Sequence, residues 1–454
     1  MPWREGEKVF KDPVHGYIYV HDPLVWDLIN TRELQRLRRI HQLGTAYLIY
    51  PGGEHSRFSH ALGVYEVIRQ ILSHFTRNGY EWPHQYDQLV AVSGLLHDIG
   101  HAPFSHALEP IFGAHHERWS QRIILDANSE VHQVLAQVGD DFPRQVADVL
   151  AKRHPSRLVV SLVSGQLDAD RLDYLMRDSL FTGVDYGKFD LARILRVLVP
   201  WKDRLVVKRS GLHTVEAYLL ARYFMYWQVY FHPVCRAAEI VLKKTLLRAQ
   251  DLSREGSLPE VPHPALAKLL TGEPLAVDDY LALDDFVLMT AFGLWRRSPD
   301  PVLSDLAGRL LDRRLFKYRD YASADPYRLR QIEAWVAEAG FEPRYYCEVD
   351  ESGTVYYDYY LGEEHPDGEA GALFLWNPED GRLTEMSRLS HPINAIARER
   401  QVERRLYLPA EVLEDVRWAD QILQLTSRPG LQAPGFQPSP PPDGEESLGE
   451  DGAR

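Results

Sequence analysis

A short stretch at residues 94–109, GLLHDIGHAPFSHALE, most constrains how this chain can fold. It follows an apolar run, and three histidines and one aspartate fall within ten of its residues. If the run continues as a helix, His97 and Asp98 lie about 100° apart around it, and His101 lies one turn further on. Imidazole and carboxylate ligands in such a cluster are typical of a site for divalent Fe, Mn, Co, Ni or Zn.

The same stretch also predicts where its helix stops. Pro103 ends the helix, and the segment after it brings His106 back toward the turn. The alternative is a helix terminus that carries ordinary polar capping residues.

Composition restricts the class of protein. The chain has 454 residues, 45% of them hydrophobic and 26% charged, as in ordinary soluble globular proteins. Its formal charge of −14 argues against broad binding to nucleic acid. It has no apolar run long enough for a membrane span and no apolar signal segment at its start, so we expect a cytoplasmic protein. Two cysteines are too few for a disulfide framework or a cysteine-based zinc site.

Apolar spacing predicts a mainly α protein. Residues 7–22 alternate around a His-Gly turn, which predicts a short hairpin. A helix capped by Asn30 or Thr31 is expected to run to Gly44. Further helices are expected at residues 57–75, 87–101, 115–125, 140–154, 159–183, 214–250 (interrupted at Pro233) and within 263–340.

The composition changes near residue 341. Residues 341–410 alternate and are rich in tyrosine, which predicts three or four strands, and one more helix follows. We therefore predict a helical catalytic core at 1–340 and a small α+β subdomain at 341–428. The acidic, proline-rich tail at 429–454 is expected to be disordered.

A metal site needs ligands besides His97 and Asp98. His60 opens an apolar helix, where a lone histidine is more often a cap or a core residue than a metal ligand. The segment DADRLDYLMRD offers four candidates, and spacing alone does not choose among them: Asp168, Asp170, Asp173 and Asp178.

Five blocks in order resemble one family of enzymes. They are KDPVHGYI, NTRELQRLRRIHQLGTA, GGEHSRFSHALGVYE, GLLHDIGHAPFSHALE and DADRLDYLMRD. Together they resemble the HD-domain phosphohydrolase superfamily, and within it the deoxynucleoside triphosphate triphosphohydrolases of the SAM-and-HD-domain type and their bacterial relatives. The match is dense over residues 7–245. It implies an HD-domain helical core and hydrolysis of a dNTP to a deoxynucleoside and inorganic triphosphate.

The resemblance also assigns roles. It implies that the metal ligands are His60, His97, Asp98 and Asp170. His106 is our candidate proton donor, since imidazole titrates near neutral pH. Glu109 is expected to keep it charged, and His101 to contact the α-phosphate. His116 and Glu117 resemble a second His–acid pair of the family.

Several predicted residues bind the substrate. Arg57 lies about one turn before His60 and can reach a phosphate beside the metal. By resemblance, Arg171 and Arg222 bind the triphosphate, with Mg expected on its oxygens. The sugar is expected to contact Gln42, Leu43, Asp178 and Tyr174, whose ring excludes a 2′-hydroxyl. Tyr230 and His232 are expected at the base, where Pro233 replaces a frequent lysine of the family.

The family's nucleotide-activated members are tetramers. The resemblance therefore predicts a homotetramer with activator contacts from Lys8, Val9, Asn30, Gln35 and Arg38. Asn30 stands where guanine-specific members carry an acid, and an amide cannot accept both guanine N–H groups equally well. The alternatives are another HD phosphohydrolase, acting on a nucleoside monophosphate or a cyclic nucleotide, and a catalytically weak nucleotide sensor.

Overall fold

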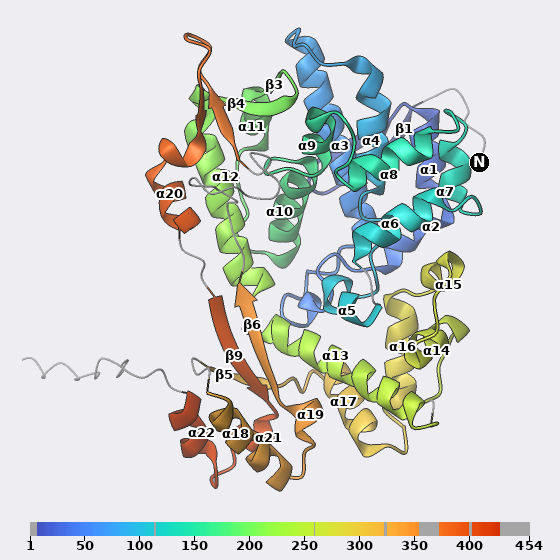
Figure 1. Cartoon of the computed structure of the whole chain (residues 1–454), viewed down its shortest axis with the longest axis vertical. Coiled ribbons are helices and arrows are strands. Elements are labelled where there is room, and N and C mark those ends of the chain that lie inside the picture. Colours follow the sequence, from blue (N-terminus) through green and yellow to red (C-terminus); the bar gives the residue numbers. More distant parts are fainter. Residues whose placement is uncertain are drawn as a thin grey trace, which may run out of the picture.

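The computed structural model of the chain describes residues 7–112, 115–257, 259–321, 325–353, 372–398 and 402–426. Helices dominate these ranges, and small sheets lie at the N-terminus and in the C-terminal part (Figure 1). The predicted mainly α fold is confirmed. Within the described ranges, no helix is both long and apolar enough to cross a membrane.

The elements follow the chain in this order. The first part contains β1 (Lys8–Asp12), β2 (Gly16–Val20), α1 (Pro23–Ile29), α2 (Arg32–Arg36), α3 (Arg57–Arg77), α4 (Asp87–Leu96), α5 (Glu109–Phe112), α6 (His116–Leu125), α7 (Glu130–Leu135), α8 (Phe142–Leu150), α9 (Arg157–Val163), α10 (Ala169–Thr182), α11 (Leu191–Val197), β3 (Leu198–Trp201), β4 (Arg204–Lys208) and α12 (Leu212–Met225). The second part contains α13 (Pro233–Arg254), α14 (Pro264–Thr271), α15 (Val277–Leu281), α16 (Asp285–Trp295), α17 (Pro301–Leu311), β5 (Lys317–Asp320), α18 (Pro326–Glu338), α19 (Pro343–Tyr346), β6 (Glu348–Gly353), β7 (Phe374–Trp376), β8 (Leu383–Glu385), α20 (His391–Arg398), β9 (Val402–Leu408), α21 (Ala410–Leu413) and α22 (Ala419–Thr426).

The predicted N-terminal hairpin is present. Strands β1 and β2 pair antiparallel, with Lys8 opposite Val20 and Asp12 opposite Gly16. Gly16 has a φ of +77°, a conformation that glycine adopts without strain. Ile18 and Val20 are fully buried, so the hairpin is anchored to the helical core by one face.

Helix α3 lies at the centre of the helical core and packs against α4 and α10. Its apolar residues are buried along most of its length, as their helical spacing predicted. Asp168 caps the N-terminus of α10 with a side chain that accepts from the Arg171 N–H, and Gly183 caps its C-terminus in the left-handed conformation. These three helices carry or directly precede the predicted metal ligands.

The helix predicted at 87–101 is shorter than expected. It ends at Leu96, and the following residues form turns. The Ser120 hydroxyl donates to the His97 carbonyl at 3.2 Å and accepts from the Gly100 N–H at 3.0 Å. The Ser120 side chain, which comes from α6, therefore takes the place of the next helical hydrogen bonds. The helix ends before it reaches Pro103, so this proline is not the cause.

The helix predicted to run to Gly44 also ends early. Thr31 is its N-cap, and α2 gives way to a 3₁₀ turn at Leu37–Arg39. The chain is then extended because His41 pairs with Ser56 and the Gln42 N–H donates to the His55 carbonyl. Gln42 and Leu43 consequently lie in a loop.

The interruption predicted at Pro233 is confirmed. Helix α12 passes into a π-helical turn at Tyr226–Tyr230, and α13 starts at Pro233. A π-turn of this kind is often found at functional sites. Helix α13 then crosses the molecule below the first group of helices (Figure 1).

The strands predicted after residue 341 are present in part, but they do not form one sheet. Strands β7 and β8 extend the hairpin β3–β4, and β6 and β9 form a sheet with β5. Both sheets thus cross the predicted boundary at 341, and the division into domains stays a prediction. The final predicted helix is two short ones, α21 and α22. The tail at 429–454 lies outside the described residues.

Candidate metal centre

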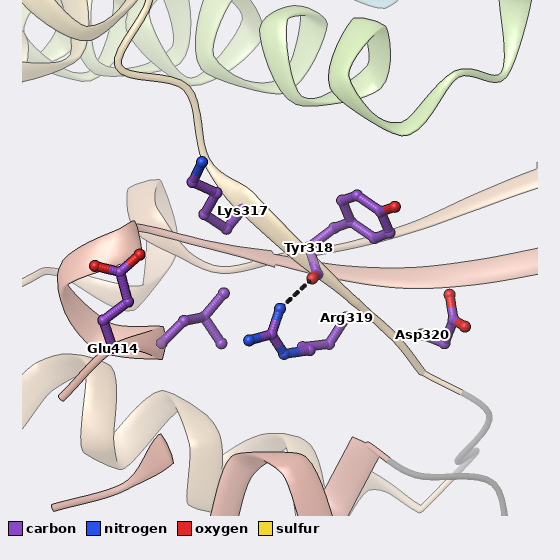
Figure 2. A pocket seen from close by; sticks show the side chains of 6 residues that line it. Lys317, Tyr318, Arg319, Asp320 and Glu414 are labelled. Atoms are coloured by element: carbon purple, nitrogen blue, oxygen red, sulfur yellow. Dashed lines mark hydrogen bonds between the residues drawn. The ribbon is translucent and has the colours of Figure 1, made fainter. Parts of the chain in front are cut away.

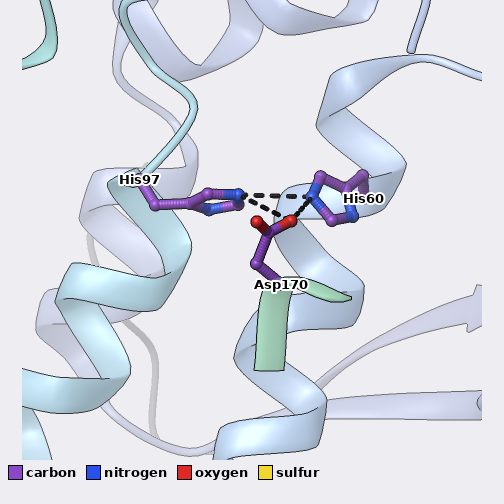
Figure 3. Close-up of side chains that lie close together, drawn as sticks. All are labelled: His60, His97 and Asp170. Carbon is purple, nitrogen blue, oxygen red and sulfur yellow. Dashed lines mark hydrogen bonds and ion pairs between the residues drawn. The ribbon is translucent and has the colours of Figure 1, made fainter. Parts of the chain in front are cut away.

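Three of the four predicted ligands form one tight group (Figure 3). His60 comes from α3, His97 directly follows α4, and Asp170 lies in the first turn of α10. The His60 Nε2 atom lies 3.2 Å from His97 Nε2 and 3.1 Å from Asp170 Oδ1. The His97 Nε2 atom lies 3.5 Å from Asp170 Oδ1. Side chains from distant parts of the sequence therefore converge on one point.

The donor set fits a divalent metal. The Nδ1 atoms of both histidines contact acceptors, Asp173 Oδ2 at 2.7 Å and the Gly94 carbonyl at 2.8 Å, and each therefore carries the ring proton. This leaves the two Nε2 lone pairs facing each other, which is unfavourable unless a cation lies between them. Bonds of about 2.1 Å to one metal place neighbouring ligand atoms about 3.0–3.4 Å apart, close to the separations found here.

Asp98, the fourth predicted ligand, lies between this group and a second one that contains His101 and His116. Its Oδ1 atom is 3.2 Å from His97 Nε2, and its Oδ2 atom is 3.8 Å from His60 Nε2. Oδ2 also accepts a hydrogen bond from Arg57, whose Nε donates to the Ser105 hydroxyl at 2.9 Å. Arg57 begins α3, as expected, and its buried guanidinium faces the carboxylate that it adjoins.

The electrostatics of the group favour added positive charge. Burial raises the pKa of a carboxyl group, but His97, Arg57 and His101 outweigh it and hold the pKa of Asp98 well below its usual range. Burial lowers the pKa of His60, yet its bonds to Asp170 and Asp173 raise that pKa to about 10. The carboxylates therefore make this volume favourable for a cation, either a proton or a metal ion.

A second group of side chains adjoins the first. The His101 Nε2 atom lies 3.2 Å from Asp98 Oδ1, and the His101 ring stacks on His116 at 3.9 Å. Asp98, His101 and His116 are close enough to bind one ion together. Burial, followed by the charges of Arg57 and His116, keeps the pKa of His101 well below its usual value.

The acid beside His116 differs from the predicted one. Glu117 is exposed, and Glu109 instead contacts His116 Nδ1 at 2.6 Å. Among the described residues the acid that contacts His116 is Glu109, and a catalytic role for Glu117 stays a prediction. The side chain of His106 is not among those described, so its pairing with Glu109 stays a prediction.

Two arginines lie near the first group, on the side of α10 and α12. Arg171 contacts Asp168 at the helix N-terminus. Burial and the nearby charge of Arg171 lower the pKa of Arg222, but the surrounding tyrosines, Tyr174 first, outweigh them and raise it. Arg222 is buried and donates from Nη1 to Gln166 Oε1 at 2.9 Å. Its Nε has no hydrogen-bond partner among the described residues. An anion placed here would satisfy that donor.

Tyrosines and a carboxylate border the same space. The Tyr174 ring packs edge-on against both His60 and Tyr230, with centroids 6.4 and 6.2 Å away. Tyr230 donates to Asp178 Oδ2 at 2.8 Å, and His55 Nε2 lies 2.7 Å from Asp178 Oδ1. The predicted sugar residues Tyr174 and Asp178 are thus brought together near the metal ligands.

The other predicted substrate residues are placed as follows. Gln42 has a buried Oε1 without a hydrogen-bond partner in the described part of the chain, while Leu43 is partly buried beside it. His232 caps α13 by accepting from the Val234 N–H, and its ring lies 6.0 Å from that of Tyr50. The open acceptor of Gln42 is a place where a ligand hydroxyl can donate.

The predicted activator residues lie at the surface of the hairpin and of α2. Lys8 extends over the Trp26 ring, and Val9 is exposed. Gln35 accepts from Arg38 at 2.8 Å, and Asn30 is exposed and donates to the Trp26 carbonyl. Nothing in this arrangement identifies a bound nucleotide.

Sequence reasoning missed residues that support the His-rich loop. Fully buried Arg36 donates to the carbonyls of His101 and Leu283, at 2.9 and 2.7 Å. Asp285 accepts from the Phe104 N–H at 2.8 Å, which steadies a residue whose φ of +52° is uncommon outside glycine. Only contacts between residues 65 to 247 positions apart in the sequence reveal these roles, and no local signal marked them.

A separate hollow lies away from the histidines. It has a volume of about 400 Å³, borders strand β5 and is lined by Lys317, Tyr318, Arg319, Asp320, Leu413 and Glu414 (Figure 2). The Arg319 guanidinium donates to the Tyr318 carbonyl at 3.0 Å. Its mixture of charges and its place in the lower part of the molecule separate it from the candidate metal centre.

Comparisons with known proteins agree with this geometry. Residues 57–175 match the HD domain, and residues 189–257 match the HD associated region. An uncharacterized protein of Bacillus subtilis, YwfO, is 45% identical over 411 residues, which cover 90% of this chain and 94% of YwfO. The crystal structure of a phosphohydrolase from Bacteroides thetaiotaomicron superposes with a TM-score of 0.79 at 31% identity, covering 89% of this chain and all of that one.

A relative whose activity is named is more distant. The deoxynucleoside triphosphate triphosphohydrolase SAMHD1 homolog of Dictyostelium discoideum is 28% identical over 262 residues, which cover 55% of this chain and 50% of the relative. The fold, the ligand cluster and these matches together place the chain among the HD-domain hydrolases. The chain belongs to the HD-domain phosphohydrolase superfamily and is related within it to the SAMHD1-type triphosphohydrolases.

Proposed function

We propose that this protein is a metal-dependent dNTP triphosphohydrolase that releases a deoxynucleoside and inorganic triphosphate. The observation that carries the proposal is the partly buried His–Asp cluster with arginines and tyrosines gathered beside it. Monophosphate and cyclic nucleotide substrates need fewer cations than Arg57, Arg171 and Arg222 supply. The named activity of the SAMHD1 relatives supports the same substrate.

The proposed ligands are His60, His97, Asp98 and Asp170. A divalent ion held by them supplies two things, a lower pKa for a bound water and polarisation of a phosphoryl oxygen. Fe, Mn, Co, Ni and Zn all suit imidazole and carboxylate donors, and Mg is proposed on the outer phosphates. The second group, Asp98, His101 and His116, faces the same phosphate region.

The residues of the chain position the triphosphate and supply protons. Water adds its oxygen to the α-phosphorus, the bond from that phosphorus to the 5′-oxygen breaks, and the 5′-oxygen takes up a proton. Arg171 and Arg222 balance the charge of the departing triphosphate, and Arg57 holds Asp98 in place. His106 remains the proposed proton donor. His101, whose Nε2 lies 3.2 Å from Asp98 Oδ1, is the proposed contact to the α-phosphate.

The proposed sugar subsite selects deoxyribose by shape. The Tyr174 ring fills the space expected at the 2′ carbon, so a 2′-hydroxyl collides with it. Asp178 and the open acceptor of Gln42 are proposed to bind the 3′-hydroxyl, with Leu43 beside them. Tyr230 and His232 border the base.

Activation by nucleotide at tetramer contacts is part of the proposal. It rests on the resemblance of Lys8, Val9, Asn30, Gln35 and Arg38 to activator-contact residues. Val9, Asn30 and Arg38 are exposed, and Lys8 and Gln35 are partly buried, which is compatible with an intersubunit site.

The test is a matrix of metals and nucleotides with chromatography of the products. Full-length protein is stripped with a chelator, reloaded with Fe, Mn, Co, Ni or Zn, and given single or mixed dNTPs. We expect triphosphate and deoxynucleoside from a reloaded sample, and no turnover from His97→Ala. His84→Ala, which changes an exposed histidine, is the control and keeps activity. Release of phosphate or diphosphate indicates another HD phosphohydrolase, and tight binding without turnover indicates a sensor.

A further inference from the structure

The N-terminal hairpin sends two side chains into the core toward the candidate metal centre. Asp12 ends β1, and its Oδ1 accepts from the backbone N–H groups of Val14 and His15 at 2.9 Å each. This carboxylate therefore fixes the turn of the hairpin. The His15 side chain is almost fully buried, with an exposed fraction of 2%.

Asp173 accepts hydrogen bonds from three different elements. Its Oδ2 lies 2.7 Å from His60 Nδ1, and its Oδ1 lies 2.6 Å from His15 Nε2. Arg177, one turn along α10, donates to both oxygens at 2.8 and 3.0 Å. Burial raises the pKa of Asp173, but Arg177 and the bonds from His15 and His60 hold it well below its usual range. The carboxylate is consequently ionised and can only accept.

Arg177 connects this carboxylate back to the hairpin. Its Nη1 donates to Asp12 Oδ2 at 2.8 Å, and its side chain has no exposed surface. Gly63 on α3 provides the space that the pair occupies. A Cβ atom at this position would lie 1.9 Å from Asp173 Oδ1 and 2.4 Å from Arg177 Nη2. The network is thus built into α3, α10 and the hairpin together.

We propose that Asp173 is a positioning residue that turns His60 Nε2 toward the metal, and that the hairpin supports the metal centre through His15 and Asp12. The inference rests on the metal site of the proposed function. A carboxylate behind a ligand histidine fixes its tautomer and orientation. Because the hairpin provides one of the donors to that carboxylate, displacing the hairpin loosens His60. The metal affinity of this protein therefore depends on a surface element that contributes no ligand.

The test measures binding of Co²⁺ alone to the full-length, chelator-stripped protein. Competition with a chelator gives the dissociation constant, and the visible absorption of bound Co²⁺ reports its ligand geometry. We expect Asp173→Asn to weaken binding about 10–100-fold and His15→Ala about 3–10-fold, with a changed spectrum in both. His15→Gln, whose amide can still donate to Asp173, restores part of the loss.

The chain offers a control for the loss of one acid partner of a buried arginine. Arg309, like Arg177, is buried and shared between an aspartate four residues earlier and an acid from a distant segment. Asp12→Asn and Glu411→Gln each remove the distant acid from such an arginine. We expect only Asp12→Asn to weaken Co²⁺ binding, because Glu411 lies on α21 and belongs to the far part of the molecule.

Two results would overturn the proposal. One is unchanged Co²⁺ affinity and spectrum in folded Asp173→Asn and His15→Ala; the other is a wild-type protein that binds no Co²⁺. If Asp173→Asn does not fold, the comparison of His15→Ala with His15→Gln decides. The readout uses no nucleotide, so the two proposals fail separately. A wild type that hydrolyses no dNTP, with weaker Co²⁺ binding in the variants, refutes the proposed activity and supports the positioning role.

Discussion

Substitution of Gly63 by alanine provides a sharp test of the network behind His60. In an ordinary helix interior, Gly→Ala stabilises a protein by about 1 kcal/mol. Here the new Cβ would meet Asp173 Oδ1 at 1.9 Å, and neither Asp173 nor Arg177 can retreat into solvent. The methyl group must therefore displace the carboxylate from the position in which it contacts His60.

The magnitude follows from three contributions. Overpacking of a tight interior costs about 2 kcal/mol, and loss of one charge-assisted hydrogen bond costs about 2 kcal/mol. The helix propensity of alanine returns about 1 kcal/mol. We therefore expect Gly63→Ala to lower the free energy of unfolding by about 3 kcal/mol and to weaken Co²⁺ binding.

The assay is denaturant unfolding followed by circular dichroism, together with the Co²⁺ competition measurement. Gly293→Ala is the control, because Gly293 lies on α16, is exposed and has no atom within 4 Å of its added Cβ among the described residues. This control is expected to gain up to about 1 kcal/mol. If Gly63→Ala gains stability to the same extent and keeps its Co²⁺ affinity, the reasoning about Asp173 is wrong.

Three further predictions concern the substrate, the metal and acid stability. Tyr174→Ala should reduce the preference for dGTP over GTP about 10–100-fold, because the ring no longer blocks the 2′-hydroxyl; an unchanged ratio of kcat/KM values removes Tyr174 from that role. Chelation should abolish dNTP turnover, and adding back one of the proposed metals should restore it; full activity in EDTA contradicts the metal site. The pKa of Asp173 is lower in the folded protein than in the unfolded chain, so its stabilisation is present above about pH 4 and is lost as the pH falls. Acidification from about pH 5 to about pH 3 should therefore lower the melting temperature of wild type more than that of Asp173→Asn, and equal decreases would count against this assignment.

Much of the secondary structure was predictable from the sequence because its causes are local. Alternation and a His-Gly turn predicted the hairpin, and apolar spacing predicted α3 and α6. Thr31 was one of two predicted caps of α2, and the structure confirms it. The residue types of the metal cluster were also visible, since histidines and an aspartate crowd one short stretch.

Packing decided where helices end and which strands pair. Helix α4 ends at Leu96 because the hydroxyl of Ser120, from another helix, takes over the bonds of His97 and Gly100. The strands after residue 341 join β4 and β5 from earlier in the chain. Such partners are distant in sequence, so no local pattern identifies them.

The four aspartates at the N-cap of α10 and along it show most clearly what the sequence determined and what packing decided. Sequence spacing left them equivalent, and the resemblance chose Asp170. In the structure Asp170 faces His60 and His97, and Asp173 contacts His60 from behind, while the other two have separate partners: Asp168 contacts Arg171, and Asp178 contacts His55 and Tyr230. The sequence alone determined that carboxylates recur along one helix. Only the packing of α3 and the hairpin against that helix decided which role each one has, because a carboxylate acts on the groups opposite it and those groups come from elsewhere in the chain.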